Sequence, residues 1–121
     1  MQNSKFKIQN SGLLLILIFT LCFVGFAGAT VGYVTKSITA QNTFSEAAAM
    51  QGYFNLSLSG TWDATVTVQR SYDSGSTWVD VKTFTANTEE VGYEPETGVL
   101  YRFGVKTGAF TSGTVVGRIS R

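Results

Sequence analysis

Two alternating stretches decide the fold, Tyr53-Phe-Asn-Leu-Ser-Leu-Ser59 and Trp62-Asp-Ala-Thr-Val-Thr-Val-Gln-Arg70. In each of them apolar and polar side chains take turns, with the period of two that is typical of a strand buried on one face. The side chains expected to face inward are Phe54, Leu56, Leu58, Trp62, Ala64, Val66 and Val68, and in a later stretch Val99, Tyr101, Phe103 and Val105 share one face in the same way. Because Gly60-Thr61 separates the two stretches, we expect a turn there and a hairpin between the strands.

Further strands are predicted at short intervals along the remaining chain. The pattern indicates strands over 43–46, 77–85, 89–93, 99–106 and 113–120, separated by turn-forming Gly, Asn, Asp and Pro, whereas Ser45–Met50 reads as a brief helical turn or a bulged strand. Short strands spaced by roughly 8–12 residues are typical of β-sandwiches. We therefore expect an all-β chain: an immunoglobulin-like or fibronectin-like antiparallel β-sandwich of about seven strands over 43–121, preceded by an apolar N-terminal helix.

The N-terminal part of the chain is uncharged and apolar. No charge occurs from Ile8 to Thr35, the stretch Leu13–Phe26 is almost wholly apolar, and Lys5 and Lys7 precede it. For residues 1–34 this pattern predicts either a secretory signal peptide cleaved after Ala29, or a retained helix that crosses a membrane over 12–34 or lies buried in an assembly. Residues 35–42 follow as a linker or an irregular first strand. All three alternatives imply a β-domain that is exported, membrane-anchored or virion-associated.

Composition excludes several classes of function. The chain has no His, so it lacks an imidazole base, a His metal ligand and a Ser-His-Asp triad. Its single Cys, Cys22, cannot form an intrachain disulfide or a thiolate zinc site. The net charge of +1 gives no electrostatic footprint for nucleic acid. A binding or structural protein is favoured over an enzyme, with no catalytic, cofactor or metal residue assigned.

The most specific local motif is Ser71-Tyr-Asp-Ser-Gly-Ser-Thr-Trp78. Its pattern Ser-x-Asp-x-Gly-x-Thr-Trp resembles the Asp-box, a hairpin repeated in sialidases and other β-propellers. We expect Asp73 to accept hydrogen bonds from its own turn, Gly75 to take a positive φ, Ser71 and Thr77 to face one another, and Trp78 to pack beneath. One copy and about seven strands are too few for a propeller, so we interpret this hairpin as structural.

The remaining candidate residues lie in turns and at strand ends. Tyr72 and Tyr93 are possible ligand contacts because aromatic rings near turns can stack on sugars, whereas Trp62, Trp78 and Tyr101 are expected in the core. Glu89-Glu90 and Glu94-x-Glu96 indicate a solvated acidic loop or a weak Ca²⁺ site, although no EF-hand loop accompanies them. Arg118 and Arg121 are expected either to protect an exposed edge on the last strand or to bind an anion.

The stretch 43–121 resembles a family of small β-rich proteins encoded beside virion genes of tailed bacteriophages and prophages. The resemblance rests on Phe54–Trp62, Val66–Trp78, Glu90–Arg102 and Thr111–Thr114, and Glu94-Pro-Glu-Thr-Gly-Val-Leu-Tyr-Arg102 is its most specific part. It implies a virion-associated structural or host-contact module with no catalytic residues, although such proteins usually lack an apolar leader like 1–34.

Several partners are expected from this resemblance and from the leader. They are other copies of the chain or neighbouring structural proteins, a glycan or receptor, and a membrane contacted through 12–34; no nucleic acid is expected. The alternative is a bacterial secreted or membrane-anchored module that binds glycan or protein, and a hydrolase remains a minor option.

Overall fold

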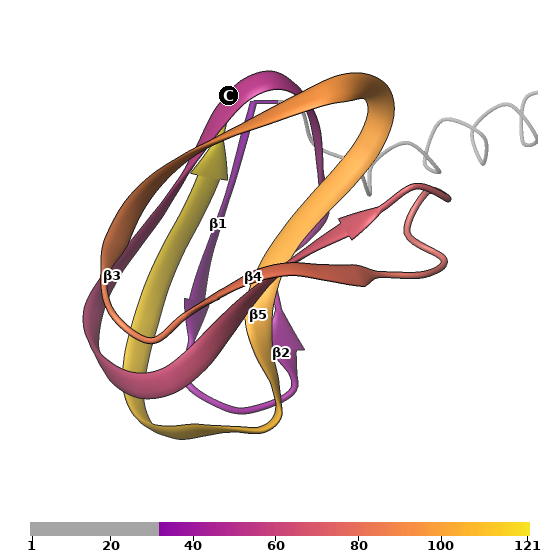
Figure 1. Cartoon of the computed structure of the whole chain (residues 1–121). Coiled ribbons are helices and arrows are strands. Elements are labelled where there is room, and N and C mark those ends of the chain that lie inside the picture. The colour runs from indigo at the N-terminus through magenta and orange to yellow at the C-terminus, as the bar shows by residue number, and fades with distance from the viewer. Residues whose placement is uncertain (1–31) are drawn as a thin grey trace, which may run out of the picture.

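The structure is a computed structural model, and it describes residues 32–121. Their regular structure consists of strands in one antiparallel sheet (Figure 1). The strands are β1 (Tyr33–Ile38), β2 (Thr43–Phe44), β3 (Ala48–Ser71), β4 (Val79–Phe84) and β5 (Thr88–Ser120). The all-β, antiparallel character expected from the alternating sequence is therefore confirmed.

Strand β3 continues without interruption through the position of the expected hairpin, so the turn predicted at Gly60-Thr61 is wrong. Gly60 lies opposite Val115 of β5, and both halves of β3 pair with β5 instead of with each other. Gly60 has a φ of 104°, and a Cβ added there would lie 2.4 Å from the carbonyl oxygen of Thr114. The glycine thus allows a bend with close backbone contact where the sequence had indicated a reversal of the chain.

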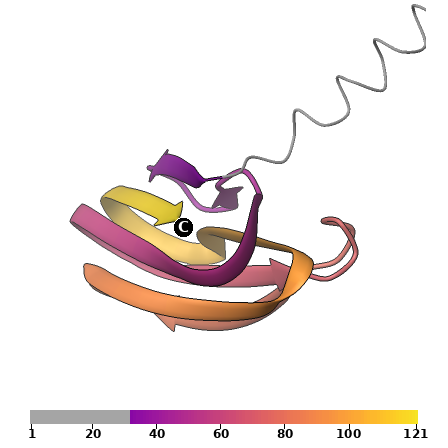
Figure 2. The ribbon, with the colours of Figure 1, turned by 90° about the horizontal axis from the view of Figure 1, so that it is seen from above.

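The bends in β3 and β5 carry both strands between two layers (Figures 1 and 2). The first layer consists, in pairing order, of β5 residues 88–94, β3 residues 52–58, β5 residues 115–120 and β1. The second layer consists of β4, β3 residues 66–71 and β5 residues 99–105, followed by β2 and β3 residues 48–50, which both pair with the other side of that β5 segment. Several strands that the sequence indicated as separate are therefore parts of two long strands.

The ends of the domain differ from the sequence-based boundaries. Residues 33–38 form β1, which pairs with 115–120 along its whole length, so 35–38 follow the first-strand alternative and not the linker. The C-terminal segment lies between β1 and β3, so it is not the exposed edge that Arg118 and Arg121 were expected to protect. The edge on that side of the first layer is β1.

The core lies between the layers and consists of side chains that alternation had placed inward. Phe54 and Trp62 are half-buried and pack against this core. The predicted inward positions that are buried are Leu56, Leu58, Ala64, Val66, Val68, Val99, Tyr101, Phe103 and Val105. Those inward predictions are confirmed, and Val34 and Ile38 of β1 add to the same core.

The leader falls mostly outside the described residues. Tyr33 and Val34 lie in β1, so a membrane helix cannot extend to Val34 as expected for 12–34. The other expectations for 1–31, including cleavage after Ala29, concern residues that the structure does not describe. Within 32–121 no helix is long and apolar enough to cross a membrane.

Candidate functional site

The hairpin between β3 and β4 is held by hydrogen bonds to one carboxylate. Asp73 accepts from the Thr77 backbone N–H at 2.9 Å and from the Thr77 hydroxyl at 2.6 Å, and its Oδ1 lies 2.8 Å from the Ser71 hydroxyl. Gly75 has the expected positive φ of 92°, and its N–H donates to Ser71 Oγ at 2.8 Å. Ser71 and Thr77 therefore meet through Asp73 instead of facing one another.

This arrangement stabilises the ionised form of Asp73. The hydrogen bonds from the Thr77 hydroxyl, the Thr77 N–H and Ser71 lower the pKa of Asp73 to about 2. All the donors belong to the turn itself, so the carboxylate is used to close the hairpin. The motif is a structural element of the β3–β4 connection.

Trp78 lies on the outer surface of the second layer instead of in the core. The guanidinium of Arg102 lies 4.3 Å from the centroid of the Trp78 ring and 4.3 Å from that of Phe44. Arg102 Nε also donates to Gln69 at 2.8 Å, and burial lowers the pKa of Arg102. The expectation of a core Trp78 is thus wrong, because the indole forms one side of a cation–π stack on the sheet surface.

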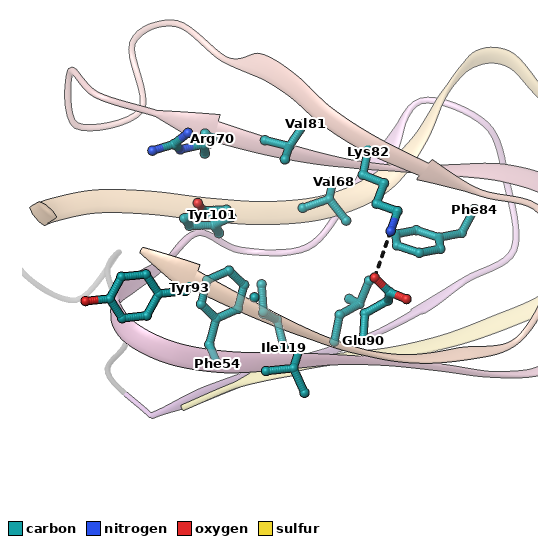
Figure 3. Close-up of a pocket in the computed structure, with 13 residues that line it drawn as sticks. Phe54, Val68, Arg70, Val81, Lys82, Phe84, Glu90, Tyr93, Tyr101 and Ile119 are labelled. Carbon is teal, nitrogen blue, oxygen red and sulfur yellow. Dashed lines mark hydrogen bonds and ion pairs between the residues drawn. The ribbon is translucent and has the colours of Figure 1, made fainter. Parts of the chain in front are cut away.

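A pocket of about 320 Å³ opens between β4 and β5 residues 88–94 (Figure 3). Its floor and walls are mainly apolar: Phe54, Leu56, Val68, Val81, Phe84, Val91, Tyr101 and Ile119. Four further residues, Arg70, Lys82, Glu90 and Tyr93, also line it, and Lys82 Nζ contacts Glu90 Oε1 at 2.8 Å across the gap between the two strands (Figure 3).

The other ion pair of this region is buried. Glu94 is inaccessible to solvent, and its Oε1 lies 2.6 Å from Arg70 Nη2 and 2.7 Å from the Tyr101 hydroxyl. Burial raises the pKa of Glu94, but hydrogen bonds from Tyr101 and from the Glu96 N–H, together with Arg70, outweigh it and hold the pKa below its ordinary value. Glu94 is therefore an interior residue, and the predicted solvated acidic loop is wrong at this position.

The two tyrosines singled out from the sequence are placed apart. The ring of Tyr72 lies 4.8 Å from the Arg70 guanidinium, at one end of the pocket region. Tyr93 instead pairs across the first layer with Tyr53, and their ring centroids are 4.9 Å apart. Tyr53 was not selected from the sequence, although its place before the Phe54–Ser59 alternation marks an outward side chain.

The outer face of the first layer holds this aromatic pair. Tyr53, Val91 and Tyr93 are 75%, 74% and 59% exposed. A shallow hollow beside them is lined by Tyr53, Phe54, Asn55, Val91, Ser120 and Arg121. Such a surface combines aromatic rings with hydroxyl, amide and guanidinium groups, which suits contact with a sugar or another protein.

Two further acidic side chains, those of Glu89 and Asp80, have partners within the fold. Glu89 accepts a hydrogen bond from Ser57, and Asp80 accepts from Lys106 and from Gln69. The bond from Lys106 is the main reason why the pKa of Asp80 is lowered. Among residues 32–121 no group of three His, Cys, Asp or Glu side chains is arranged to hold a metal ion.

Comparison of the chain with protein-family models, with curated proteins and with solved structures found no match.

Proposed function

We propose that the chain is a non-enzymatic structural or adhesive module of a phage virion or surface assembly. In this proposal an immunoglobulin-like sandwich is displayed outward by the apolar N-terminal segment. The observation that carries it is the exposure of Tyr53, Val91 and Tyr93 together on one face of the first layer. Exposed apolar side chains that cluster on one face of a small domain mark an interaction surface.

The composition of that face supports contact with a neighbour. Its polar positions are mostly hydroxyl and amide groups: Ser120 donates to Asn55 at 2.9 Å, and Ser57 donates to Glu89. Neutral groups that are already hydrogen-bonded cost less to remove from water than free charges do. The face can therefore be covered by another protein without burying many unpaired groups.

The use of the carboxylates supports a structural role. Asp73 closes a turn and Glu94 is buried against Arg70. A glycosidase needs two carboxylates that face each other across a substrate cleft. Glu90, which lines the pocket, is paired with Lys82, and Glu94, which contacts the lining residues Arg70 and Tyr101, is paired with Arg70.

The layers support the finer assignment to an immunoglobulin-like sandwich. Each layer is antiparallel, and the buried rows of β3 and β5 face a common core. The segment from Gly12 to Val31 supports the proposed attachment. Its centre, Leu13–Phe26, has the length of the apolar region of an export signal, and the whole segment is long enough for membrane insertion.

The proposal is tested by mass spectrometry of washed particles and envelope fractions from the organism that encodes the chain. We expect peptides from 32–121 at a fixed copy number in one of these assemblies. Peptides that cover Leu13–Phe26 show whether the leader is kept. Recovery of the chain only as a free protein would overturn the proposal.

The Tyr53–Tyr93 pair favours a second candidate, a secreted or membrane-anchored module that binds glycan or protein. Here the rings stack on a sugar, with Asn55 and Arg121 beside them. Binding on a glycan array should be lost in Tyr53→Ala and Tyr93→Ala and kept in Tyr72→Ala, whose ring is exposed but lies against Arg70. Equal binding by all three variants would eliminate this site.

A further inference from the structure

We propose that copies of this chain join head to tail, by pairing β1 of one copy with β5 residues 88–94 of the next. Among residues 32–121, each of these segments has a partner on one side only: β1 pairs with 115–120, and 88–94 pairs with β3. They are the two edges of the first layer. The inference rests on the proposed function, because it specifies how such a structural module contacts its neighbours.

The strand directions permit this junction without any rearrangement. Within the first layer every neighbouring pair is antiparallel, from 88–94 through 52–58 and 115–120 to β1. Four segments that alternate in direction leave the two edges running opposite ways. A second copy placed beside the first in the same orientation therefore presents 88–94 antiparallel to β1, and the pairing continues across the junction.

Both edges carry exposed apolar side chains on the same outer face. Tyr33 of β1 is 57% exposed, and Val91 and Tyr93 are the corresponding side chains on the other edge. The register aligns Tyr33 with Ser120, Asn55 and Val91 in one row across the layer. In the junction Tyr33 would become a cross-strand neighbour of Val91 or Tyr93 of the next copy, which removes these rings from water.

Opposite charges lie at the two edges. Lys36 is on β1 and Arg118 is on its neighbour, where the Arg118 guanidinium lies 4.6 Å from the Tyr33 ring; neither is ion-paired within 32–121. The other edge carries Glu89, which accepts a hydrogen bond from Ser57, and Glu90, which is ion-paired with Lys82 of the same copy. Arg118 and Glu89 share the outer row Thr35–Arg118–Ser57–Glu89, whereas Lys36 and Glu90 belong to rows of the inner face. On the outer face, Arg118 and Glu89 therefore supply opposite charges that no other ion pair within 32–121 uses, whereas on the inner face Lys36 would share Glu90 with Lys82.

The same charges disfavour symmetric pairing. An acidic edge repels a second acidic edge, and a basic edge repels a second basic edge. Pairing of unlike edges is heterologous, so it generates a ring if the rotation between copies closes and a filament if it does not. Either form suits a repeated structural part of a particle or surface layer.

The test uses the full chain in a mild non-ionic detergent, so that the apolar stretch Leu13–Phe26 does not itself drive association. Sedimentation velocity compares the wild type with Lys36→Glu, which reverses the β1 charge, and with Val91→Lys, which places a cation on the acidic edge. Val79→Lys is the matched control, because Val79 is an exposed valine on β4, at the edge of the second layer. Far-UV circular dichroism checks that each variant is folded.

Wild type and Val79→Lys are expected to grow beyond the dimer as concentration rises, and to dissociate when salt is raised because exposed charges are screened. Lys36→Glu and Val91→Lys should each remain monomeric alone and associate when mixed, because each still offers one unaltered edge. Association that persists in either variant alone, or a monomeric wild type, would overturn the head-to-tail junction. A chain that is monomeric here but present in washed particles contradicts only this inference and leaves the proposed function standing.

Discussion

Arg70 Nη2 lies 2.6 Å from Glu94 Oε1, and the Glu94 side chain is completely buried. The Tyr101 hydroxyl donates to the same carboxylate oxygen, and the Glu96 N–H donates to the other. These bonds join β3 to β5 where β5 passes from the first layer into the second. The carboxylate therefore fixes the path of the chain between the layers.

Replacing Glu94 should destabilise the whole domain. In Glu94→Gln the carboxylate charge is lost and Arg70 keeps its own charge without a partner; since the Arg70 side chain is 27% exposed, water screens part of that cost. We expect the free energy of unfolding in urea to fall by about 3 kcal/mol, near the lower end of the range for a broken buried pair. Tyr101→Phe removes one hydrogen bond and should cost less, about 1–2 kcal/mol. A loss below about 1 kcal/mol in Glu94→Gln would contradict the structural role.

Acid should weaken the domain through Glu94 and Asp73. The folded state lowers the pKa of both groups, that of Asp73 to about 2, relative to ordinary values of about 4.3 and 3.9 for Glu and Asp in unfolded chains. A lowered folded pKa gives stability that is full above the unfolded pKa and is lost as the pH falls through the folded pKa. Unfolding free energies should therefore decline from about pH 5 to pH 2, and less steeply in Glu94→Gln. An equal slope in the two proteins would show that Glu94 does not contribute.

The β3–β4 hairpin should loosen locally when its carboxylate is neutralised. Asp73→Asn keeps the shape of the side chain but weakens the charge-assisted hydrogen bonds from Thr77. We expect hydrogen exchange of the Thr77 amide to accelerate by about tenfold or more, while amides of Val66 and Phe103 in the core are little changed. Ser76→Ala is the control, because the Ser76 side chain is exposed in the same turn. Equal acceleration in both variants would argue against a specific role for Asp73.

Close packing between the layers should make Gly117 intolerant of a side chain. A Cβ added at Gly117 would lie 2.2 Å from Cε2 of the buried Phe103 ring. Gly117→Ala is therefore expected to lower the free energy of unfolding by about 1–3 kcal/mol through overpacking. Phe103→Leu should also lower the free energy of unfolding. The double variant should lose less than the sum of the two single losses, because the smaller Leu side chain leaves room for the added methyl group. Strict additivity in this double-mutant cycle would show that the two residues do not compete for space.

The alternation of apolar and polar residues within each strand was the main basis for predicting the strands and the core. The alternation of apolar and polar residues was enough to assign three rows to the core: Leu56–Leu58, Val66–Val68 and Val99–Val105. In a strand that is buried on one face, this alternation shows which side chains point inward. The path between strands is not local. Gly60-Thr61 has the residue types of a turn. Only the close approach of Gly60 to Thr114, more than fifty residues away, shows that the strand bends there and continues.

The candidate site was harder to predict, for a related reason. Asp73 bonds within its own turn, so the motif Ser71–Trp78 was sufficient to indicate its role. Nothing in the local sequence distinguishes Glu94 from Glu96, two residues further on. Glu94 is buried because Arg70 and Tyr101, which lie elsewhere in the sequence, bind its carboxylate. The Tyr53–Tyr93 pair likewise exists only through the register of β3 with β5, so Tyr93 was selected without its actual partner.

The most direct test of a structural role is quantitative mass spectrometry of washed virions and surface assemblies from the organism that encodes the chain. If the chain is a structural or adhesive module, peptides from 32–121 will persist through washing at a constant ratio to the major structural protein. Absence of these peptides from every washed assembly, with the chain recovered only as a free protein, would contradict that role.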